Sequence, residues 1–136
     1  MVILFDRFNL PQDIFEIIFS TSQQNIVALE LIRYMIARKG EIDKQEMSEF
    51  ATKLHDGRYE CTLDDGPYKG KRVKLSYNKR QFYDRILTPM KAMGLIDYDL
   101  YKKTYRVSMK FSADLIKIGQ MWKEELKKRG MHVEHA

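Results

Sequence analysis

The sequence predicts a mainly α-helical α+β domain with a small β-ribbon near its end. Apolar residues recur at spacings of three and four along most of the 136 residues, which is the period of a helix with one buried face. Two late segments, 95–98 and 104–109, are instead expected as strands, because Tyr105, Val107 and Met109 alternate with polar residues. A third observation concerns charge. The stretch 69–110 holds twelve Lys or Arg against three acids, whereas the whole chain carries only +5.

The first two expected helices are apolar on broad faces. Pro11 suits the first turn of a helix at about 10–20. The apolar face of that helix comprises Ile14, Phe15, Ile17, Ile18 and Phe19. A capping box from Thr21 to Gln24 is expected to begin a second helix, which runs to about Arg38 and stops at Gly40. This helix is apolar nearly all round, as expected of a central helix.

A helix and a hairpin are expected next. Asp43 and Glu46 form a second capping box, and the helix that they begin carries Met47, Phe50, Ala51 and Leu54 at helical spacing. Two alternating runs then flank the turn 64–67, which predicts a β-hairpin over 58–75. The alternating apolar residues of these runs are Tyr59, Cys61, Leu63, Val73 and Leu75.

The last elements follow a third cap. Asn78 is expected to cap a helix that ends at Gly94 and whose inner face carries Phe82, Ile86, Met90 and Met93. The two strands and their tip at 99–103 come next. Ser112 is expected to cap a final helix that ends at Gly130. We therefore expect one domain over 1–136, with a core at about 25–110 and flanking helices at about 10–20 and 111–129.

This order of elements resembles a winged helix-turn-helix domain. The most specific stretch is FYDRILTPMKAMGLI, from Phe82 to Ile96, followed by Tyr105-Arg-Val. A helix that ends in Leu/Met-x-x-x-Gly-Leu-Ile and is followed by a strand pair is similar to winged-helix regulators of the MarR and PadR groups. Two features depart from the pattern. The turn before the fourth helix is stretched to about twenty residues, and Pro89 interrupts that helix at a cost of about 3 kcal/mol in an ordinary interior.

The resemblance and the local charge both imply double-stranded DNA as the partner. An α-helix fits the major groove, where Arg and Gln can bond base edges, and lysines on a ribbon or hairpin can meet phosphates. On the helix we expect DNA contacts from Tyr77, Asn78, Lys79, Arg80, Gln81, Asp84, Thr88 and Lys91. On the ribbon and hairpin we expect them from Lys69, Lys71, Arg72, Lys74, Lys102, Lys103 and Arg106.

Asp84 argues against a purely basic surface, since a carboxylate facing phosphate is repelled. It can accept from cytosine N4, or pair with Arg80 or Lys91 within its own helix, and the sequence favours the intrahelical pair.

Other chemistry is poorly supported. The segment GPYKGKR (66–72) is one residue short of a phosphate-binding loop, and Arg72 stands where that loop needs a hydroxyl. His132 and His135 lie in an expected loose tail, and His55 has no partner at metal-ligand spacing. Cys61 alternates inward as a small core residue. We therefore expect no enzyme activity, no metal and no cofactor.

The terminal helices need a partner surface. They can pack on each other, or form a two-fold dimer interface, as the resemblance implies. The interface residues would then be Ile14, Phe15, Ile18, Leu115, Ile118, Trp122 and Leu126. We expect a homodimeric, cytoplasmic transcriptional regulator of archaeal or bacterial type, a repressor, with no membrane association.

Two alternatives stay open. One is a winged-helix module that docks on another protein in a transcription, replication or membrane-remodelling assembly. The other is a regulator that senses a small-molecule effector between the terminal helices and the core.

Overall fold

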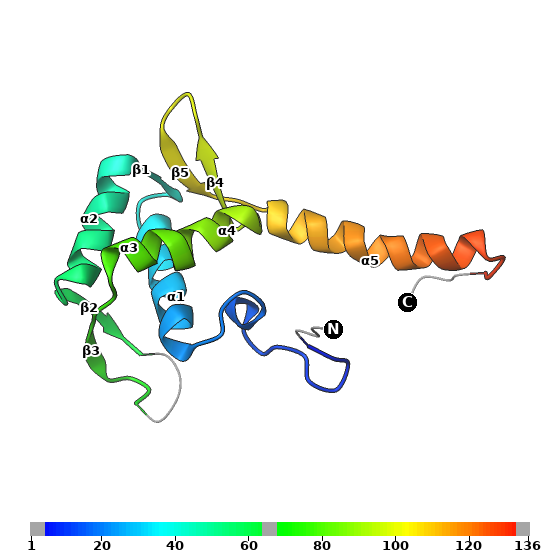
Figure 1. Cartoon of the computed structure of the whole chain (residues 1–136), viewed down its shortest axis with the longest axis horizontal. Helices are drawn as coiled ribbons and strands as arrows, with labels where there is room; N and C mark the ends of the chain where they lie inside the picture. Colours follow the sequence, from blue (N-terminus) through cyan, green and yellow to red (C-terminus); the bar gives the residue numbers. More distant parts are fainter. Residues whose placement is uncertain (1–4, 64–67, 133–136) are drawn as a thin grey trace.

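The computed structural model describes residues 5–63 and 68–132 of the chain. It has an α+β fold in which short antiparallel sheets accompany a group of helices (Figure 1). In chain order the elements are η1 (Ile14–Ile17), α1 (Ser22–Ile36), β1 (Glu41–Asp43), α2 (Lys44–His55), β2 (Tyr59–Thr62), β3 (Arg72–Leu75), α3 (Lys79–Gln81), η2 (Phe82–Leu87), α4 (Thr88–Ala92), β4 (Ile96–Asp99), β5 (Thr104–Val107) and α5 (Lys110–Lys128).

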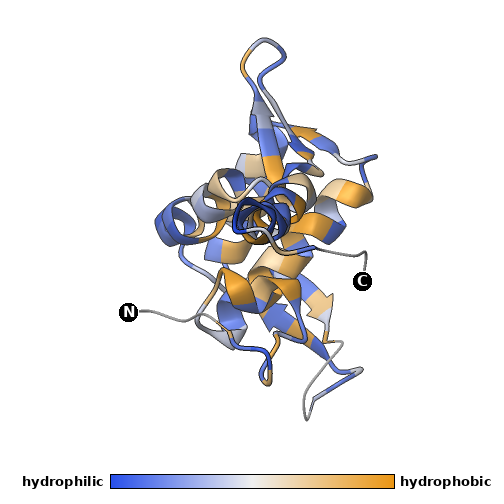
Figure 2. Ribbon diagram, turned by 90° about the vertical axis from the view of Figure 1, so that its right-hand side faces the viewer, coloured by the Kyte–Doolittle hydropathy of each residue, from blue (hydrophilic) through white to orange (hydrophobic). Residues whose placement is uncertain are grey.

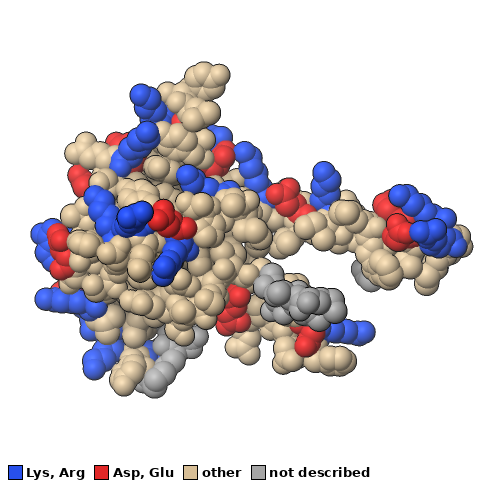
Figure 3. Space-filling model, in the orientation of Figure 1, with Lys and Arg blue, Asp and Glu red and all other residues tan. Residues whose placement is uncertain are grey.

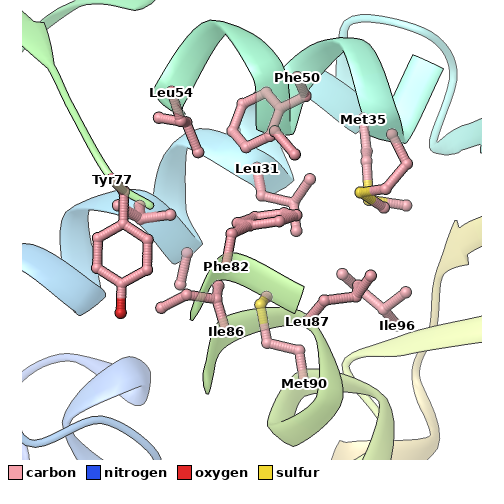
Figure 4. Close-up of a cluster of buried hydrophobic side chains, with 14 of the residues drawn as sticks. Leu31, Met35, Phe50, Leu54, Tyr77, Phe82, Ile86, Leu87, Met90 and Ile96 are labelled. Carbon is pink, nitrogen blue, oxygen red and sulfur yellow. The ribbon is translucent and has the colours of Figure 1, made fainter. Parts of the chain in front are cut away.

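The core is built around α1, α2 and the helical run 79–92, by which we mean α3, η2 and α4 together. From α1, Leu31 and Met35 are fully buried, as expected of a central helix. Phe82 of the helical run lies among the side chains that α1 and α2 contribute (Figure 4). Its ring centroid is 5.5 Å from that of Phe50, which also contacts the Tyr59 ring at 5.0 Å. The core therefore joins all three helical elements to the β2–β3 hairpin.

Local capping signals place the starts of α1 and α2. The Thr21 hydroxyl accepts a hydrogen bond from the backbone N–H of Gln24 at 3.2 Å. The second capping box is complete, because Asp43 accepts from the Glu46 N–H at 2.8 Å and Glu46 accepts from the Asp43 N–H at 3.1 Å. These bonds satisfy backbone donors that a helix start leaves free. The capping box at Asp43 is confirmed, and of the predicted box at Thr21 the structure shows the bond to the Thr21 hydroxyl.

The two sheets lie on opposite sides of the helical body (Figures 1 and 2). β2 and β3 form the predicted hairpin, with Cys61 opposite Val73, and the predicted turn at 64–67 lies outside the described residues. On the other side, β4 and β5 pair so that Tyr98 faces Tyr105. β1, which the sequence analysis did not predict, adds a third strand in the order β1-β5-β4.

The predicted helix at 10–20 was wrong. Only η1, a single 3-10 turn, forms there, with the Asp13 carboxylate accepting from the Phe15 N–H at 2.9 Å. The caps at Asp13 and Thr21 leave about two helical turns between them, and the isoleucines of this segment are β-branched residues with lower helix propensity. The two phenylalanines of this segment, Phe15 and Phe19, are still buried against the body.

α5 projects from the body (Figure 1). It begins at Lys110 rather than at Ser112, because the Ser108 hydroxyl accepts from the Lys110 N–H at 3.1 Å and β5 ends at Val107. Phe111 is the one buried side chain of α5, whose residues are all described. The helix is thus attached through its first turn, while the rest of its length extends into solvent.

Candidate nucleic-acid interface

The helical run 79–92 is anchored at its start to the end of α2. The Asn78 side chain accepts from the Gln81 N–H at 3.0 Å, which confirms the predicted cap. The backbone N–H of Lys79 donates to His55 Nδ1 at 3.1 Å, and His55 is the last residue of α2. Two helices that are far apart in sequence are therefore joined at the point where the exposed face of the run begins.

Lys79 is held by α2. Its Nζ donates to Ser48 Oγ and Thr52 Oγ1, both at 3.0 Å. The Tyr83 hydroxyl also bonds Ser48, although burial is the larger influence and raises the pKa of Tyr83. Lys79 was expected to contact DNA, but its ammonium uses two of its three donors on α2, so it contributes a fixed positive charge between the helices.

The expectation that Tyr77 lies on the solvent side was wrong. Tyr77 is only 8% exposed, and its backbone N–H donates to the carbonyl of Leu54 at 3.0 Å. Tyr77 precedes the Asn78 cap, where the chain is not helical, so the helical spacing of the run does not extend to it. Tyr77 therefore belongs to the core (Figure 4) and does not form part of the candidate interface.

The exposed face of the run is mixed in charge. Arg80 Nε lies 3.9 Å from Asp84 Oδ2, and their side chains are 92% and 68% exposed. This is the intrahelical pair that the sequence favoured. An ion pair this exposed contributes little energy, so the guanidinium can leave it for a stronger acceptor. The remaining exposed residues of this face are Gln81, Arg85, Thr88 and Lys91.

A π-helical segment accommodates Pro89. In η2 the Thr88 N–H donates to the carbonyl of Tyr83, five residues earlier, and the Thr88 hydroxyl donates to the same carbonyl at 2.8 Å. This wider turn lies directly before Pro89, whose missing N–H would otherwise break the bonding pattern. The run therefore continues past the proline (Figure 1). The wider turn also rotates the side chains of the run away from the directions they would have in a regular α-helix. Leu87 is therefore buried, and Met93 is 39% exposed.

The β4–β5 ribbon carries two kinds of basic residue. Arg106 contributes to the base of the ribbon, where its guanidinium lies 3.5 Å from Asp97 and Lys110 Nζ lies 2.9 Å from the same carboxylate. The hydrogen bond from Lys110 is the main reason that the pKa of Asp97 is lowered. Lys102 and Lys103 are exposed at the tip, and neither forms an ion pair with any carboxylate of the described residues.

The β2–β3 hairpin supplies a second basic area at the other end of the run. Arg72 Nε lies 3.1 Å from Glu60, and Lys71 Nζ lies 5.4 Å from the centre of the Tyr68 ring. Lys69 and Lys74 are exposed. Figure 3 shows Lys and Arg side chains over the ribbon, the helical run and the hairpin on one face, with acidic side chains among them. The basic groups predicted for the interface, apart from Lys79, are therefore accessible.

Of the residues predicted for a dimer interface, those of the first segment mostly lie in the core. Phe15 is 6% exposed and Ile18 packs against the core, which corrects their placement on a free surface. Ile14 is 42% exposed. On α5 the outcome differs, because the apolar stripe Leu115, Ile118 and Trp122 is 40%, 60% and 65% exposed, and Leu126 is partly exposed.

Metal-ligating side chains are not clustered within residues 5–63 and 68–132. No group of three or more His, Cys, Asp or Glu in those ranges could hold a metal ion. Cys61 is buried, and burial raises the pKa of its thiol, which makes the reactive thiolate scarce. An open hollow of about 310 Å³ is lined by residues from Phe5 to Ile17 alone. Within the described chain, no helix has the length and apolar character that crossing a membrane requires.

Comparisons with protein-family models, curated proteins and solved structures found no match to this chain.

Two residues of the interface were missed in the sequence. Arg85 is exposed on the helical run, and its charge was counted without being assigned to a surface. Tyr101, at the ribbon tip, is 99% exposed. The sequence placed Tyr101 between two expected strands. That position does not predict its exposure, because an aromatic residue in a short turn often packs back on the sheet.

Proposed function

We propose that this chain is a winged-helix protein that binds double-stranded DNA and regulates transcription. In this proposal the helical run 79–92 enters the major groove, and the β4–β5 ribbon is the wing. The arrangement that supports it is three helical elements, of which the last is followed directly by an antiparallel ribbon, with the short strand β1 pairing to β5, the ribbon's second strand. Winged-helix domains place a helix in the groove and a ribbon beside it on the backbone.

One observation carries the proposal: the helical run has an exposed face with Arg80 and Gln81 at its start, and its last helix, α4, packs on a ribbon whose tip carries two exposed lysines. Residues near the start of a groove-binding helix usually reach base edges, where Arg bonds guanine and Gln bonds adenine. Lysines at the tip would meet phosphates, which supply affinity without sequence information. Changing Arg80 or Gln81 should therefore alter sequence preference, whereas changing the lysines should alter affinity for every sequence.

A second copy of the chain is the partner that we propose for α5. The stripe from Phe111 to Leu126 is about 22 Å long at about 1.5 Å per residue, and beyond its first residue nothing in the described chain covers it. Gly119 lies near its midpoint, where an added Cβ would meet no atom within 4 Å. Glycine costs about 1 kcal/mol in such a helix relative to alanine, and close approach of a second helix offsets that cost. Two-fold pairing would also join two DNA-binding helices.

The test is the salt dependence of binding to duplex DNA. For each phosphate contact, log K should fall with log salt at a slope near −0.9. Changing Lys102 and Lys103 together to alanine should flatten the slope by up to about two. Lys128→Ala, which removes an exposed charge at the far end of α5, is the matched control and should leave the slope unchanged. A chain that ignores duplex DNA at low salt would refute the proposal.

Specificity is tested separately by selecting preferred sites. Arg80→Ala and Gln81→Ala should each relax preference at particular base pairs, by about 1–3 kcal/mol for a good bidentate contact. Lys102→Ala should weaken all sequences alike. Unchanged selected sites in both helix variants would mean that these side chains do not read bases.

The alternative is a winged-helix module that docks on another protein. The acid at Asp84 on the exposed face and the uncovered apolar stripe of α5 favour it. The same salt titration separates the two functions, because a protein-docking module has no reason to bind random duplex DNA with a steep salt slope.

A further inference from the structure

The tip of the β4–β5 ribbon carries two adjacent apolar side chains in solvent. Leu100 is 77% exposed and Tyr101 is 99% exposed. A single exposed apolar residue is ordinary on a protein surface. Here two of them stand together on the part of the ribbon that reaches farthest from the body (Figure 1).

The tip is held in one shape by Asp99. Its carboxylate accepts hydrogen bonds from the backbone N–H groups of Tyr101 at 2.9 Å and Lys102 at 3.1 Å. Its carbonyl accepts from the Lys103 N–H at 2.8 Å, and Lys103 adopts the left-handed conformation with φ of 57°. The hydrogen bond from Lys102 is the main reason that the pKa of Asp99 is lowered. Tyr101 therefore projects from an ordered turn.

The charges around Tyr101 indicate what it can meet. Lys102 and Lys103 follow it directly, and both are exposed. Asp99, the nearest acid in sequence, is affected by the charge of Lys102, but its carboxylate is bonded to the backbone of the turn. An aromatic ring next to exposed cations is the combination with which proteins stack on bases while neutralising the nucleic-acid backbone. Apolar side chains that enter a groove likewise act as wedges between base steps.

We propose that Leu100 and Tyr101 form a base-stacking wedge, so that the ribbon tip binds DNA at an unpaired or opened base as well as through phosphates. This inference rests on the proposed DNA-binding function and extends it. The ligand it adds is the exposed face of a base, which a fully paired duplex offers only when a step opens. The lysines supply attraction to any duplex, and the ring supplies preference for an opened one.

The experiment compares two DNA probes with the full-length chain. One is a paired duplex and the other is the same duplex ending in a fork, with 2-aminopurine at the first unpaired position. The wild-type chain should bind the fork more tightly and quench the probe. Tyr101→Ala should lose about 5- to 150-fold in affinity for the fork, the range of base–aromatic stacking energies, and should leave the paired duplex nearly unaffected. Tyr101→Phe, which keeps the ring, should behave as wild type.

A second variant separates charge from stacking. Lys102→Ala should weaken both probes by the same factor and reduce the salt slope by about one, whereas Tyr101→Ala should leave the slope unchanged. Equal binding of both probes by the wild-type chain, or an unaltered fork affinity in Tyr101→Ala, would overturn the wedge while DNA binding stands. No binding of either probe at low salt would overturn the proposed function and the wedge with it.

Discussion

Replacing Gly94 by alanine should destabilise the chain more than any other glycine-to-alanine change for which the structure gives the surroundings. Gly94 has φ of +83°, and an added Cβ would lie 2.9 Å from the backbone nitrogen of Phe111 and 3.1 Å from Lys110 Cβ. The left-handed conformation alone costs an L-residue about 1–2 kcal/mol. Because the nearest atom belongs to the backbone, the first turn of α5 must also move.

Movement of the first turn of α5 adds a second part to the loss of stability, because it disturbs the contacts of Phe111. The Phe111 N–H donates to the Gly94 carbonyl at 3.0 Å, a bond that contributes about 1 kcal/mol. Phe111 is 7% exposed, and partial exposure of its ring costs about 1 kcal/mol more. The total for Gly94→Ala is therefore about 3–4 kcal/mol.

Gly40→Ala is the matched control. Gly40 has φ of +82° and also follows a helix, but an added Cβ would meet no atom within 4 Å. Both substitutions change the unfolded chain equally, so the difference between them isolates the contact with α5. Urea unfolding followed by circular dichroism should give a difference of about 2 kcal/mol. Equal losses for the two variants would refute the view that Gly94 is needed for the close approach of α5.

Three further predictions concern the core, the anchor of the helical run and α5. Burial raises the pKa of Tyr59 to about 12 from its ordinary value of 10.0. Stability that is present below pH 10 should therefore fall as pH rises toward 12, and Tyr59→Phe should flatten that fall in a pH series of unfolding experiments. Lys79→Met, which keeps the stem but removes the donors to Ser48 and Thr52, should cost about 1–2 kcal/mol of unfolding free energy, and an unchanged value would mean that the ammonium bonds contribute nothing net. Trp122→Glu should give a folded monomer, because Trp122 is 65% exposed within one chain. The monomer should bind DNA more weakly, because two half-sites are no longer linked. Light scattering that shows a wild-type monomer at tens of micromolar would contradict the assignment of α5 as a dimer interface.

Elements with local signals could be predicted from the sequence. The capping box at Asp43 and Glu46, the cap at Asn78 and the alternation around Tyr105 each involve residues within a few positions of one another. Such signals act before any tertiary contact forms, so the sequence alone shows them.

What was missed depends on contacts between distant residues. β1 exists because Glu41 lies opposite Arg106 in the sheet, and three residues carry no strand signal of their own. The spacing at 14–19 satisfied a helical pattern, yet the buried pair Phe15 and Phe19 is placed by packing on the core and only one 3-10 turn forms. The apolar spacing therefore indicated that this segment packs on the core, but it did not determine the backbone conformation of the segment.

The residues of the candidate site also fall into two groups, those placed by local sequence and those placed by contacts with distant residues. Exposure of Arg80 and of the lysines at the tip agrees with the sequence analysis, since the outer face of a helix and the end of a turn are local properties. The placement of Lys79 could not be predicted, because it depends on hydroxyl groups about thirty residues away on α2. The direction of Tyr101 depends on the turn geometry that Asp99 imposes.

Because α5 is attached at one end only, a small rotation at its base produces a larger displacement of its far end. Its 19 residues span about 28 Å at about 1.5 Å per residue, and the contacts of its base are those of Phe111 with Gly94 and of Lys110 with Asp97. A rotation of about 10° at that base would displace the far end by about 5 Å, by simple geometry on that length. In a two-fold pair joined through such arms, the spacing between the two DNA-binding helices would be set by the angle at this one joint. Small changes at Gly94 or Asp97 would then alter which half-site separation fits, without touching a residue that contacts DNA.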